Sequence, residues 1–365
     1  MKRVALPDFP WDSLTEHKAR AAAHPDGIVD LSVGTPVDPV SASIRDALAS
    51  VSELSGYPAT HGTPALREAA VDALRRRHGI TGLSPDTVLP AIGSKELVAW
   101  LPTLLGVGAG EVVAIPELAY PTYEVGALLA GAEARRVEGL TALGPERPAL
   151  IWLNSPSNPT GRVLGVEHLR KVVEWARERG TVVVSDECYL ALGWEREPVS
   201  ILHPDVCGGS SDGLLAVHSL SKSANLAGYR AGFVTGDAQL VAGLLEVRKH
   251  AGMIVPRPVQ EAMAAALTDD EALATQRERY AGRRAVLRPA LERAGFRIDH
   301  SEAGLYLWAS MDEDNWTTVD RLARLGILVA PGSFYGPAGT RHVRVALTAT
   351  DDRIDNAVAR LDASP

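Results

Sequence analysis

The sequence predicts an α/β fold, with a mostly parallel central sheet in a large domain and a second, smaller α+β domain. The first observation is that short apolar runs alternate with helical segments through the first 255 residues, which is typical of a parallel sheet covered by helices. The second is a change of pattern after Pro256 and Pro258, where long helical segments precede short strands. The third is the length of 365 residues, which exceeds the size at which one hydrophobic core stops growing.

The elements of the large domain follow from the spacing of apolar residues. In 65–78, Leu66, Ala69, Ala73 and Leu74 recur at helical spacing, and Gly79 follows as a C-cap. Further helices are predicted at 126–130, 166–179 and 238–250, and strands at 112–115, 149–153, 182–185, 215–218 and 231–234. Because parallel strands present ligand groups at their carboxyl ends, the residues that follow these strands are the first candidates for a site.

The rest of the chain predicts the smaller domain. Helices are expected at 260–267 and 271–294, and short strands at 305–308, 327–330 and 343–347. The opening segment holds Pro and Gly turns and one helical stretch at 11–22, and we expect it to complete the small domain from the far end of the chain. The predicted divisions are an N-terminal segment at 1–37, a large domain at 38–255 and a small domain at 256–365.

Composition excludes several classes of protein. Apolar residues make up 46% and charged residues 22%, as in an ordinary globular protein. The net charge of −8 offers no broad basic surface for nucleic acid, although a local basic pocket could bind a small anion. No stretch approaches the roughly 20 apolar residues of a membrane span, and residues 1–14 lack the apolar run of a signal peptide. Cys188 and Cys207 have no metal-ligand spacing, so we expect a cytoplasmic protein without a metal site.

The strongest local signal is the run Ser219-Leu220-Ser221-Lys222, which follows the strand predicted at 215–218. A lysine amine at such a strand end could form a Schiff base with an aldehyde. The serine hydroxyls and the nearby Arg230 would suit a phosphate. Taken alone, however, a lysine in a serine-rich turn is more often a solvated surface residue.

Two further strand ends carry polar residues. Asp186 ends the strand predicted at 182–185, where its carboxylate could pair with a cationic ring nitrogen or simply cap a helix. Asn158 lies in the turn 154–161, beyond the strand predicted at 149–153. Turn chemistry explains the Pro, Ser and Gly residues there, and the Asn158 amide could also donate to a ring oxygen.

Two weaker signals complete the set. The run Gly93-Ser94-Lys95 precedes an apolar helix, so its backbone N–H groups could face an anion. Tyr120 could stack on a heteroaromatic ring, although a partly buried core tyrosine is the commoner case.

The order of these signals resembles the class I and II aminotransferases of the pyridoxal-phosphate (PLP) fold type I. The resemblance runs from about Asp30 to Leu347 and rests on Asn-Pro-x-Gly, Asp-x-x-Tyr and Ser-x-Ser-Lys followed by Gly-x-Arg. It implies the fold type I architecture, PLP as cofactor and a ping-pong reaction. In that reaction the amino group of an amino acid passes to a 2-oxo acid, and the resemblance implies 2-oxoglutarate as this acceptor.

The resemblance also implies a role for each residue. Lys222 would bind PLP as a Schiff base and then move the proton between the substrate Cα and the cofactor. Asp186 would pair with the pyridine nitrogen, while Asn158 and Tyr189 would hydrogen-bond the ring oxygen. The remaining cofactor contacts would come from Ser94, Lys95, Ser219 and Arg230 at the phosphate and from Tyr120 as the stacking ring. The usual Pro-x-Tyr spacing is lengthened here, and we assign the stacking position to Tyr120 instead of Leu118 because Tyr120 has an aromatic face.

On the substrate side, Arg344 resembles the arginine that binds the substrate α-carboxylate, although a solvated strand-edge charge would look the same in sequence. Gly34 resembles the glycine that lets backbone approach the substrate. Tyr57 resembles a tyrosine that reaches the phosphate of the neighbouring subunit, which implies a homodimer with shared active sites.

Four stretches, 6–12, 30–39, 93–102 and 116–123, look most like the N-succinyl-LL-2,6-diaminopimelate aminotransferases of lysine biosynthesis. Such a donor needs a second cationic contact, for which Lys95, Arg257 and Arg45 are unranked candidates. The alternatives are an aminotransferase for aspartate, aromatic or kynurenine-like donors, and a PLP-dependent β-lyase or synthase. A PLP-sensing transcription regulator would require a fused helix-turn-helix domain, which the sequence does not show.

Overall fold

A seven-stranded sheet is the largest element of the computed structural model, which describes residues 5–363. Residues 1–4 and 364–365, parts of the segments predicted at 1–37 and 256–365, lie outside the described residues. The strand order is β2-β8-β7-β6-β5-β3-β4, and all neighbours are parallel except those that pair with β8. The strands are β2 (Val88–Ile92), β3 (Val112–Pro116), β4 (Glu133–Val137), β5 (Leu150–Asn154), β6 (Val182–Asp186), β7 (Leu214–Ser219) and β8 (Ala231–Gly236).

Helices cover both faces of this sheet. The strands alternate between two apolar clusters; Val183 packs with one and Val184 with the other. The first cluster includes α3 (Pro64–His78), α6 (Val166–Arg179) and α10 (Arg257–Thr268), and the second includes α4 (Ser94–Leu104), α5 (Thr122–Ala130) and α9 (Ala238–Ala251). Shorter helices are α2 (Ala42–Ala49), α7 (Pro204–Cys207) and α8 (Leu220–Ser223).

The antiparallel strand β8 decides which residues meet at the edge of the sheet. The short connection through α8 pairs Ser219, the last residue of β7, with Gly232 near the start of β8. β2 is antiparallel to β8, so Ile92 at the end of β2 pairs with Ala231. The end of β2, the start of β8 and the ends of β5, β6 and β7 therefore share one edge.

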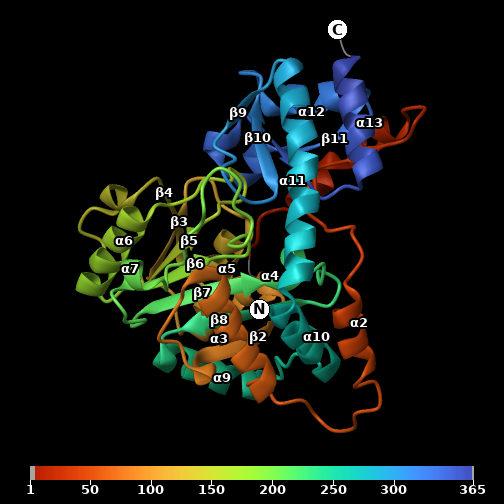
Figure 1. Cartoon of the computed structure of the whole chain (residues 1–365). Coiled ribbons are helices and arrows are strands. Elements are labelled where there is room, and N and C mark those ends of the chain that lie inside the picture. Colours follow the sequence, from red (N-terminus) through yellow and green to blue (C-terminus); the bar gives the residue numbers. More distant parts are fainter. Residues whose placement is uncertain (1–4, 364–365) are drawn as a thin grey trace.

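A second sheet of four antiparallel strands lies above the large one, as the blue part of Figure 1 shows. Its order is β12-β13-β10-β9, from β9 (Arg297–Asp299), β10 (Tyr306–Ser310), β12 (Ala330–Pro331) and β13 (Val343–Ala346). Helices α12 (Asn315–Arg324) and α13 (Asp351–Asp362) belong to the same region. The N-terminal segment lies beside it: β1 (Val29–Asp30) pairs with β11 (Ile327–Leu328), and α1 (Thr15–Ala22) packs on α12. The domain boundaries at 37/38 and 255/256 stay predictions.

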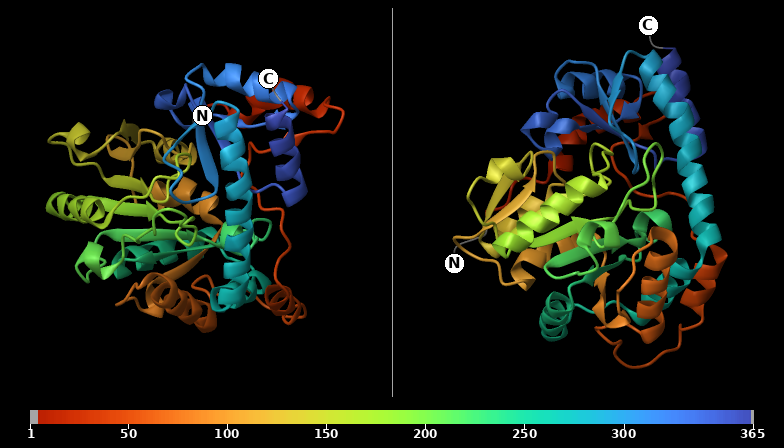
Figure 2. Two further views of the ribbon diagram at one scale, coloured as in Figure 1. Left: turned by 45° about the horizontal axis from the view of Figure 1, so that its top comes forward. Right: turned by 60° about the vertical axis from the view of Figure 1, so that its left-hand side comes forward.

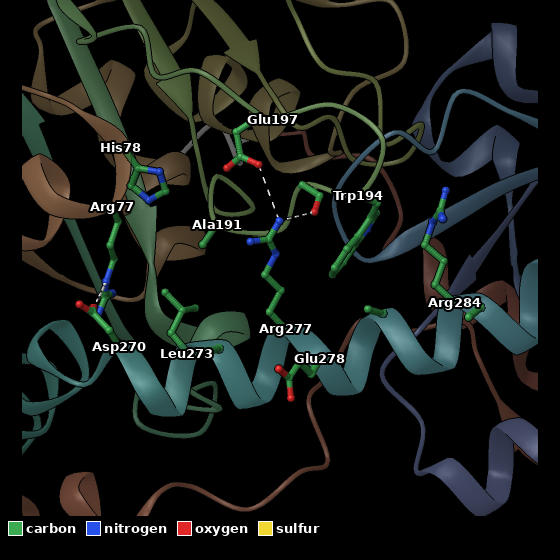
Figure 3. A pocket seen from close by; sticks show the side chains of 14 residues that line it. Arg77, His78, Ala191, Trp194, Glu197, Asp270, Leu273, Arg277, Glu278 and Arg284 are labelled. Carbon is green, nitrogen blue, oxygen red and sulfur yellow. Dashed lines mark hydrogen bonds and ion pairs between the residues drawn. The ribbon is translucent and has the colours of Figure 1, made fainter.

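The long helix α11 (Asp270–Arg293) runs from the large sheet to the small one (Figure 2). Beside it, the loop after β6 contacts both regions: Trp194 donates its indole N–H to the Gly304 carbonyl at 2.7 Å. Arg277 of α11 donates to the Gly193 carbonyl at 2.8 Å and lies 3.7 Å from Glu197 (Figure 3). These groups line a pocket of about 670 Å³. Arg277 and Arg77 line this pocket, but each is paired with a carboxylate. Neither guanidinium is therefore free to bind an anion in it.

The predicted elements agree with the structure except where local composition hides them. The predicted helix at 166–179 matches α6, but α5 begins at Thr122, earlier than predicted. The edge strands β2 and β4 were not predicted because Pro90 interrupts the first and three charged residues occupy the second. The single strand predicted at 327–330 is two strands, since β11 pairs with β1 and β12 with β13.

Single-turn 3₁₀ helices occupy several connections: η1 (Pro10–Leu14), η2 (Pro85–Thr87), η3 (Leu140–Leu143), η4 (Gly332–Tyr335) and η5 (Pro337–Gly339). Within residues 5–363, the structure has no helix of the length and apolarity that crossing a membrane requires.

Candidate active site

A cavity of about 1390 Å³ opens at the shared edge of the large sheet. The small sheet and the N-terminal segment contribute the opposite wall, through Tyr306, Arg344 and residues 6–11. The predicted site residues that line this one cavity are Gly34, Ser94, Lys95, Tyr120, Asn158, Asp186, Tyr189, Ser219, Lys222, Arg230 and Arg344. Tyr57, Arg45 and Arg257 do not line it.

Asp186, the last residue of β6, is a buried carboxylate held by two donors. The hydroxyl of Tyr123 donates to its Oδ2 at 2.7 Å, and the backbone N–H of Cys188 donates to its Oδ1 at 3.2 Å. Burial raises the pKa of Asp186. Hydrogen bonds from Cys188 and Tyr123 oppose that rise, so both favour the ionised form. A carboxylate so placed can pair with a cation in the cavity.

Lys222 projects from α8 toward the other wall of the cavity. Its Nζ donates to the carbonyl of Gly34, and its backbone carbonyl accepts from Tyr280 at 3.2 Å. A Cβ at Gly34 would collide with the Tyr306 hydroxyl, so glycine allows this close approach of the chain. Burial lowers the pKa of Lys222, which increases the share of neutral, nucleophilic amine.

Arg344 is a buried guanidinium on β13 with fixed orientation. It donates to Asn158 Oδ1 at 2.8 Å and to the Ser32 carbonyl at 2.8 Å. Its carbon lies 3.9 Å from the centroid of the Tyr306 ring, within the range of a cation–π contact. No carboxylate pairs with Arg344 within residues 5–363, so its charge is available to an anion in the cavity.

Asn158 is held at both ends. Its backbone N–H donates to Asn154 Oδ1 at 2.7 Å, while Asn154 also donates to the Asp186 carbonyl at 3.0 Å. Because Oδ1 of Asn158 accepts from Arg344, the amide NH₂ is the group left for a ligand. The turn after β5 therefore connects the two charged groups of the site.

The part of the cavity at the start of α4 suits a phosphate. Gly93 has φ +76° and immediately precedes α4, and a Cβ there would collide with the guanidinium of Arg230. Glycine therefore lets Arg230 lie against the start of the helix. The backbone N–H of Ser94, in the first turn, can donate a hydrogen bond to an anion there. Lys95 lies beside them, and burial together with Arg230 lowers its pKa.

Tyr120 lines the cavity whereas Leu118 packs elsewhere, against Trp308 and Tyr335. This placement supports Tyr120 over Leu118 as the stacking ring. Burial raises the pKa of Tyr120 to about 12, so its hydroxyl stays neutral. Tyr57 lies on the surface and is 99% exposed.

Three groups of cavity residues were missed by the sequence reasoning. Tyr306 lies across from Tyr189, with 3.1 Å between their hydroxyls. Tyr123 holds Asp186, and an aromatic cluster of Phe9, Trp11 and Phe334 lines the outer wall. The signal that could have pointed to the cluster is the presence of two large aromatic residues, Phe9 and Trp11, in a segment rich in proline.

Comparison with known proteins identifies the class. Residues 26–361 match the family described as aminotransferase class I and II, and the chain belongs to this family. It is 67% identical over 358 residues to a probable aminotransferase of Mycobacterium tuberculosis, covering 98% of this chain and 86% of the relative. It is 61% identical over 356 residues to the 4-dedimethylamino-4-oxo-anhydrotetracycline transaminase OxyQ of Streptomyces rimosus, covering 98% and 99%.

More distant relatives share the whole length. An LL-diaminopimelate aminotransferase of Gloeobacter violaceus is 32% identical over 382 residues, covering 98% of this chain and 96% of the relative. Among solved structures, an aminotransferase from Neisseria meningitidis superposes with a TM-score of 0.89 at 30% identity, covering 99% and 98%. The protein is therefore a PLP-dependent aminotransferase of fold type I.

The residues of the cavity fit PLP. A buried carboxylate at Asp186 suits the cationic ring nitrogen, and the start of α4 with Arg230 suits the phosphate. Lys222 lies in the same cavity with an amine whose pKa is lowered by burial. Groups that could attach the cofactor, pair with its ring nitrogen and bind its phosphate thus line one cavity.

Proposed function

We propose that this aminotransferase moves the amino group of N-succinyl-LL-2,6-diaminopimelate to 2-oxoglutarate in lysine biosynthesis. The observation that carries the proposal is a pair of cations on one cavity: Arg344 on the small sheet and Lys95 on the large domain. Both the donor and the acceptor have a second carboxylate, and two cations can bind both ends of such a molecule. The relatives described above carry other names, so the substrate rests on this pocket and on the sequence resemblance.

When bound, PLP supplies an aldehyde for an amine and a ring that withdraws electrons. We assign the amine to Lys222, because it is the lysine at the edge of the sheet between Asp186 and Gly34. Once it no longer holds the cofactor, the amine of Lys222 would be a free base in a buried position. In this position Lys222 would take the proton from the substrate Cα and deliver it to the cofactor carbon that carried the aldehyde.

The remaining cofactor contacts follow from position. Asp186 would keep the ring nitrogen protonated, and Asn158 and Tyr189 would hydrogen-bond the ring oxygen. Tyr120 would stack on the ring, while Ser94, Ser219 and Arg230 would bind the phosphate. The buried hydrogen bonds of Asp186 and Asn158 hold both side chains in place before the cofactor arrives.

We assign the α-carboxylate of the substrate to Arg344. Its two hydrogen bonds fix the plane of the guanidinium, and the Tyr306 ring supports one face. A bidentate contact in this plane would orient the Cα–H bond for deprotonation. Gly34 leaves room beside it, because any side chain there would displace Tyr306.

We assign the distal carboxylate to Lys95. Its Nζ lies 5.3 Å from the centroid of the Phe9 ring and has no carboxylate partner within residues 5–363. Arg257 is instead paired with Glu261 at 2.6 Å on α10, and neither it nor Arg45 lines the cavity. Among the three candidates named from sequence, the geometry therefore favours Lys95.

Replacing Lys95 by alanine tests this assignment. We expect kcat/KM to fall about tenfold or more for N-succinyl-LL-2,6-diaminopimelate and 2-oxoglutarate, since hydrogen bonds to charged groups are worth about 1.5–3 kcal/mol. Alanine and pyruvate, which lack a distal carboxylate, should lose little. Steady-state kinetics with purified holoenzyme measure both.

The matched control is Lys18→Ala, because Lys18 also lines the cavity but is exposed and lies 3.8 Å from Asp30. It should leave all four substrates nearly unchanged. If Lys95→Ala instead weakens PLP binding and affects every substrate equally, Lys95 binds the phosphate, as the family resemblance implies, and the assignment to the distal carboxylate is wrong.

The wild-type enzyme should be assayed with a panel of donors and acceptors. Turnover of another donor with none of N-succinyl-LL-2,6-diaminopimelate would refute the proposed substrate. LL-diaminopimelate belongs in the panel because relatives carry that name. Aspartate, aromatic and kynurenine-like donors test the other aminotransferase alternatives. Release of pyruvate and ammonia without a 2-oxo acid would reveal a β-lyase.

A second candidate is the amination of a polycyclic aromatic ketone. Phe9, Trp11 and Phe334 form a continuous aromatic wall, with ring centroids 5.7 Å and 5.3 Å apart. Such a wall suits a flat, apolar substrate better than a succinyl chain. The relative at 61% identity is named for a tetracycline-type ketone. A tetracyclic 4-ketone in the acceptor panel separates the two candidates.

We also propose that the enzyme is a homodimer with shared active sites. Tyr57 lies outside the cavity of its own chain and is 99% exposed, together with the nearby Leu54 at 55%. A second copy would bury both residues and place the Tyr57 hydroxyl at the neighbouring phosphate. We expect a sedimentation mass near twice 38.8 kDa, and a weaker PLP affinity for Tyr57→Phe. A monomer that binds PLP and turns over substrate normally would contradict this.

A further inference from the structure

We infer that Tyr123 is the positioning residue of the Asp186 carboxylate, whose hydroxyl holds that carboxylate against the ring nitrogen of the cofactor. The inference rests on the proposed role of Asp186. Tyr123 donates to Oδ2 of Asp186 at 2.7 Å, and both side chains are buried. The residue acts through Asp186, so it is distinct from the groups that would contact the substrate.

The surroundings of Tyr123 fix its hydroxyl in this position. It lies in the first turn of α5 and is 0% exposed. Its ring stacks on Trp152 of β5, with centroids 4.8 Å apart and an angle of 17° between the planes. The ring of Tyr120 also contacts it edge to face, with the ring centroids 5.8 Å apart. A ring packed in this way has little freedom to rotate away from Asp186.

The Tyr123 hydroxyl opposes the effect of burial on the pKa of Asp186. Asp186 lies where burial favours its neutral form, yet only the ionised form can pair with a cationic ring nitrogen. Two donors reach it directly, Tyr123 at Oδ2 and the backbone N–H of Cys188 at Oδ1. The Cys188 side chain and the Tyr123 hydroxyl also lower the pKa of Asp186 by hydrogen bonding, and Tyr123→Phe removes the hydroxyl alone. Burial and the neighbouring Asp186 raise the pKa of Tyr123, so it remains a proton donor.

Tyr123→Phe tests the inference, because it removes the hydroxyl and keeps the ring on Trp152. We expect the dissociation constant of PLP for the apoprotein to rise about tenfold or more, the size of effect of a lost hydrogen bond to a charged group. The pH at which the visible absorbance of bound PLP changes should also rise, because a more basic Asp186 takes a larger share of the ring proton. Fluorescence titration and a spectrophotometric pH titration measure these quantities.

A double-mutant cycle with Asp186→Asn separates the possible causes. If the hydroxyl acts through the carboxylate, Tyr123→Phe should have little further effect in the Asp186→Asn background. Trp152→Phe is the matched packing control, since it removes part of the packed surface but keeps an aromatic ring against Tyr123 and keeps the hydroxyl, and it should change both readouts much less. Circular dichroism and thermal unfolding of each apoprotein check that the variants fold.

The outcomes distinguish the inference from the proposed role of Asp186. If Asp186→Asn leaves PLP affinity and the absorbance titration unchanged, the role of Asp186 itself is wrong. If Asp186→Asn changes both readouts but Tyr123→Phe changes neither, only the inference fails. An equal loss from Tyr123→Phe in both backgrounds, or an equal loss from Trp152→Phe, would show that Tyr123 acts through packing and would also overturn it.

Discussion

Replacing Lys222 by alanine should abolish amino transfer and the visible absorbance of covalently bound PLP near neutral pH. Lys222 is the lysine that lies between Gly34 and the strand end bearing Asp186, and burial lowers its pKa. With the roles proposed for Lys222, the variant loses both the amine that would hold the cofactor and the base that would move the proton. Since general acid–base catalysis alone contributes about 10²- to 10⁴-fold, we expect kcat/KM to fall by at least about 10³-fold.

Lys222→Arg is the matched control for this experiment. It keeps a positive charge and a long side chain, but its guanidinium stays protonated and cannot serve as the base. It should be as inactive as the alanine variant while it retains more of the noncovalent affinity for PLP. An alanine variant that keeps both the absorbance band and the activity would show that Lys222 is not the attachment site.

Asp186→Asn should give the second largest effect. The substitution keeps the shape of the side chain but removes the charge that pairs with the ring nitrogen. Breaking a buried ion pair costs about 3–5 kcal/mol, so kcat/KM should fall by about 10²- to 10⁴-fold. PLP affinity should weaken as well, and Asp186→Glu, which restores the charge, should recover part of the loss. Near-full activity of the Asn variant would mean that Asp186 is structural.

The pH dependence of PLP binding provides an independent check on Asp186. Burial raises the pKa of this carboxyl in the apoprotein, and only its ionised form pairs with the ring cation. The affinity for PLP should therefore have its full value above that raised pKa and should fall as the pH drops through it. The Asn variant should lack this fall, and titration of both apoproteins at several pH values would show the difference.

Much of the site could be predicted because its residues directly follow apolar strands. Asn158 and Lys222 come just after β5 and β7, Asp186 ends β6, and the carboxyl ends of parallel strands share one edge. The long apolar runs fix the strands and the turn residues fix the connections. Position along the chain is then enough to place these side chains near one another.

Other residues could not be predicted, since nothing local distinguishes them. Tyr123 and Tyr306 are aromatic residues inside apolar stretches, and such residues are usually core packing. Their meaning depends on which hydroxyl or carboxylate lies opposite: Asp186 for the first, Tyr189 for the second. Those partners are distant in sequence and meet only in the folded chain.

The sequence by itself determined the family and the cofactor and singled out the lysine proposed for attachment, because strand ends and motif order are local properties. The tertiary structure decided the rest. Antiparallel pairing of β8 brings Ser94 and Arg230 to the edge of the sheet, and the small sheet carries Arg344 across to Asn158. Of the three cations considered for the distal carboxylate, Lys95 lines the cavity, whereas Arg257 and Arg45 do not. Contacts between distant segments depend on the packing of whole layers, which no short stretch of sequence contains.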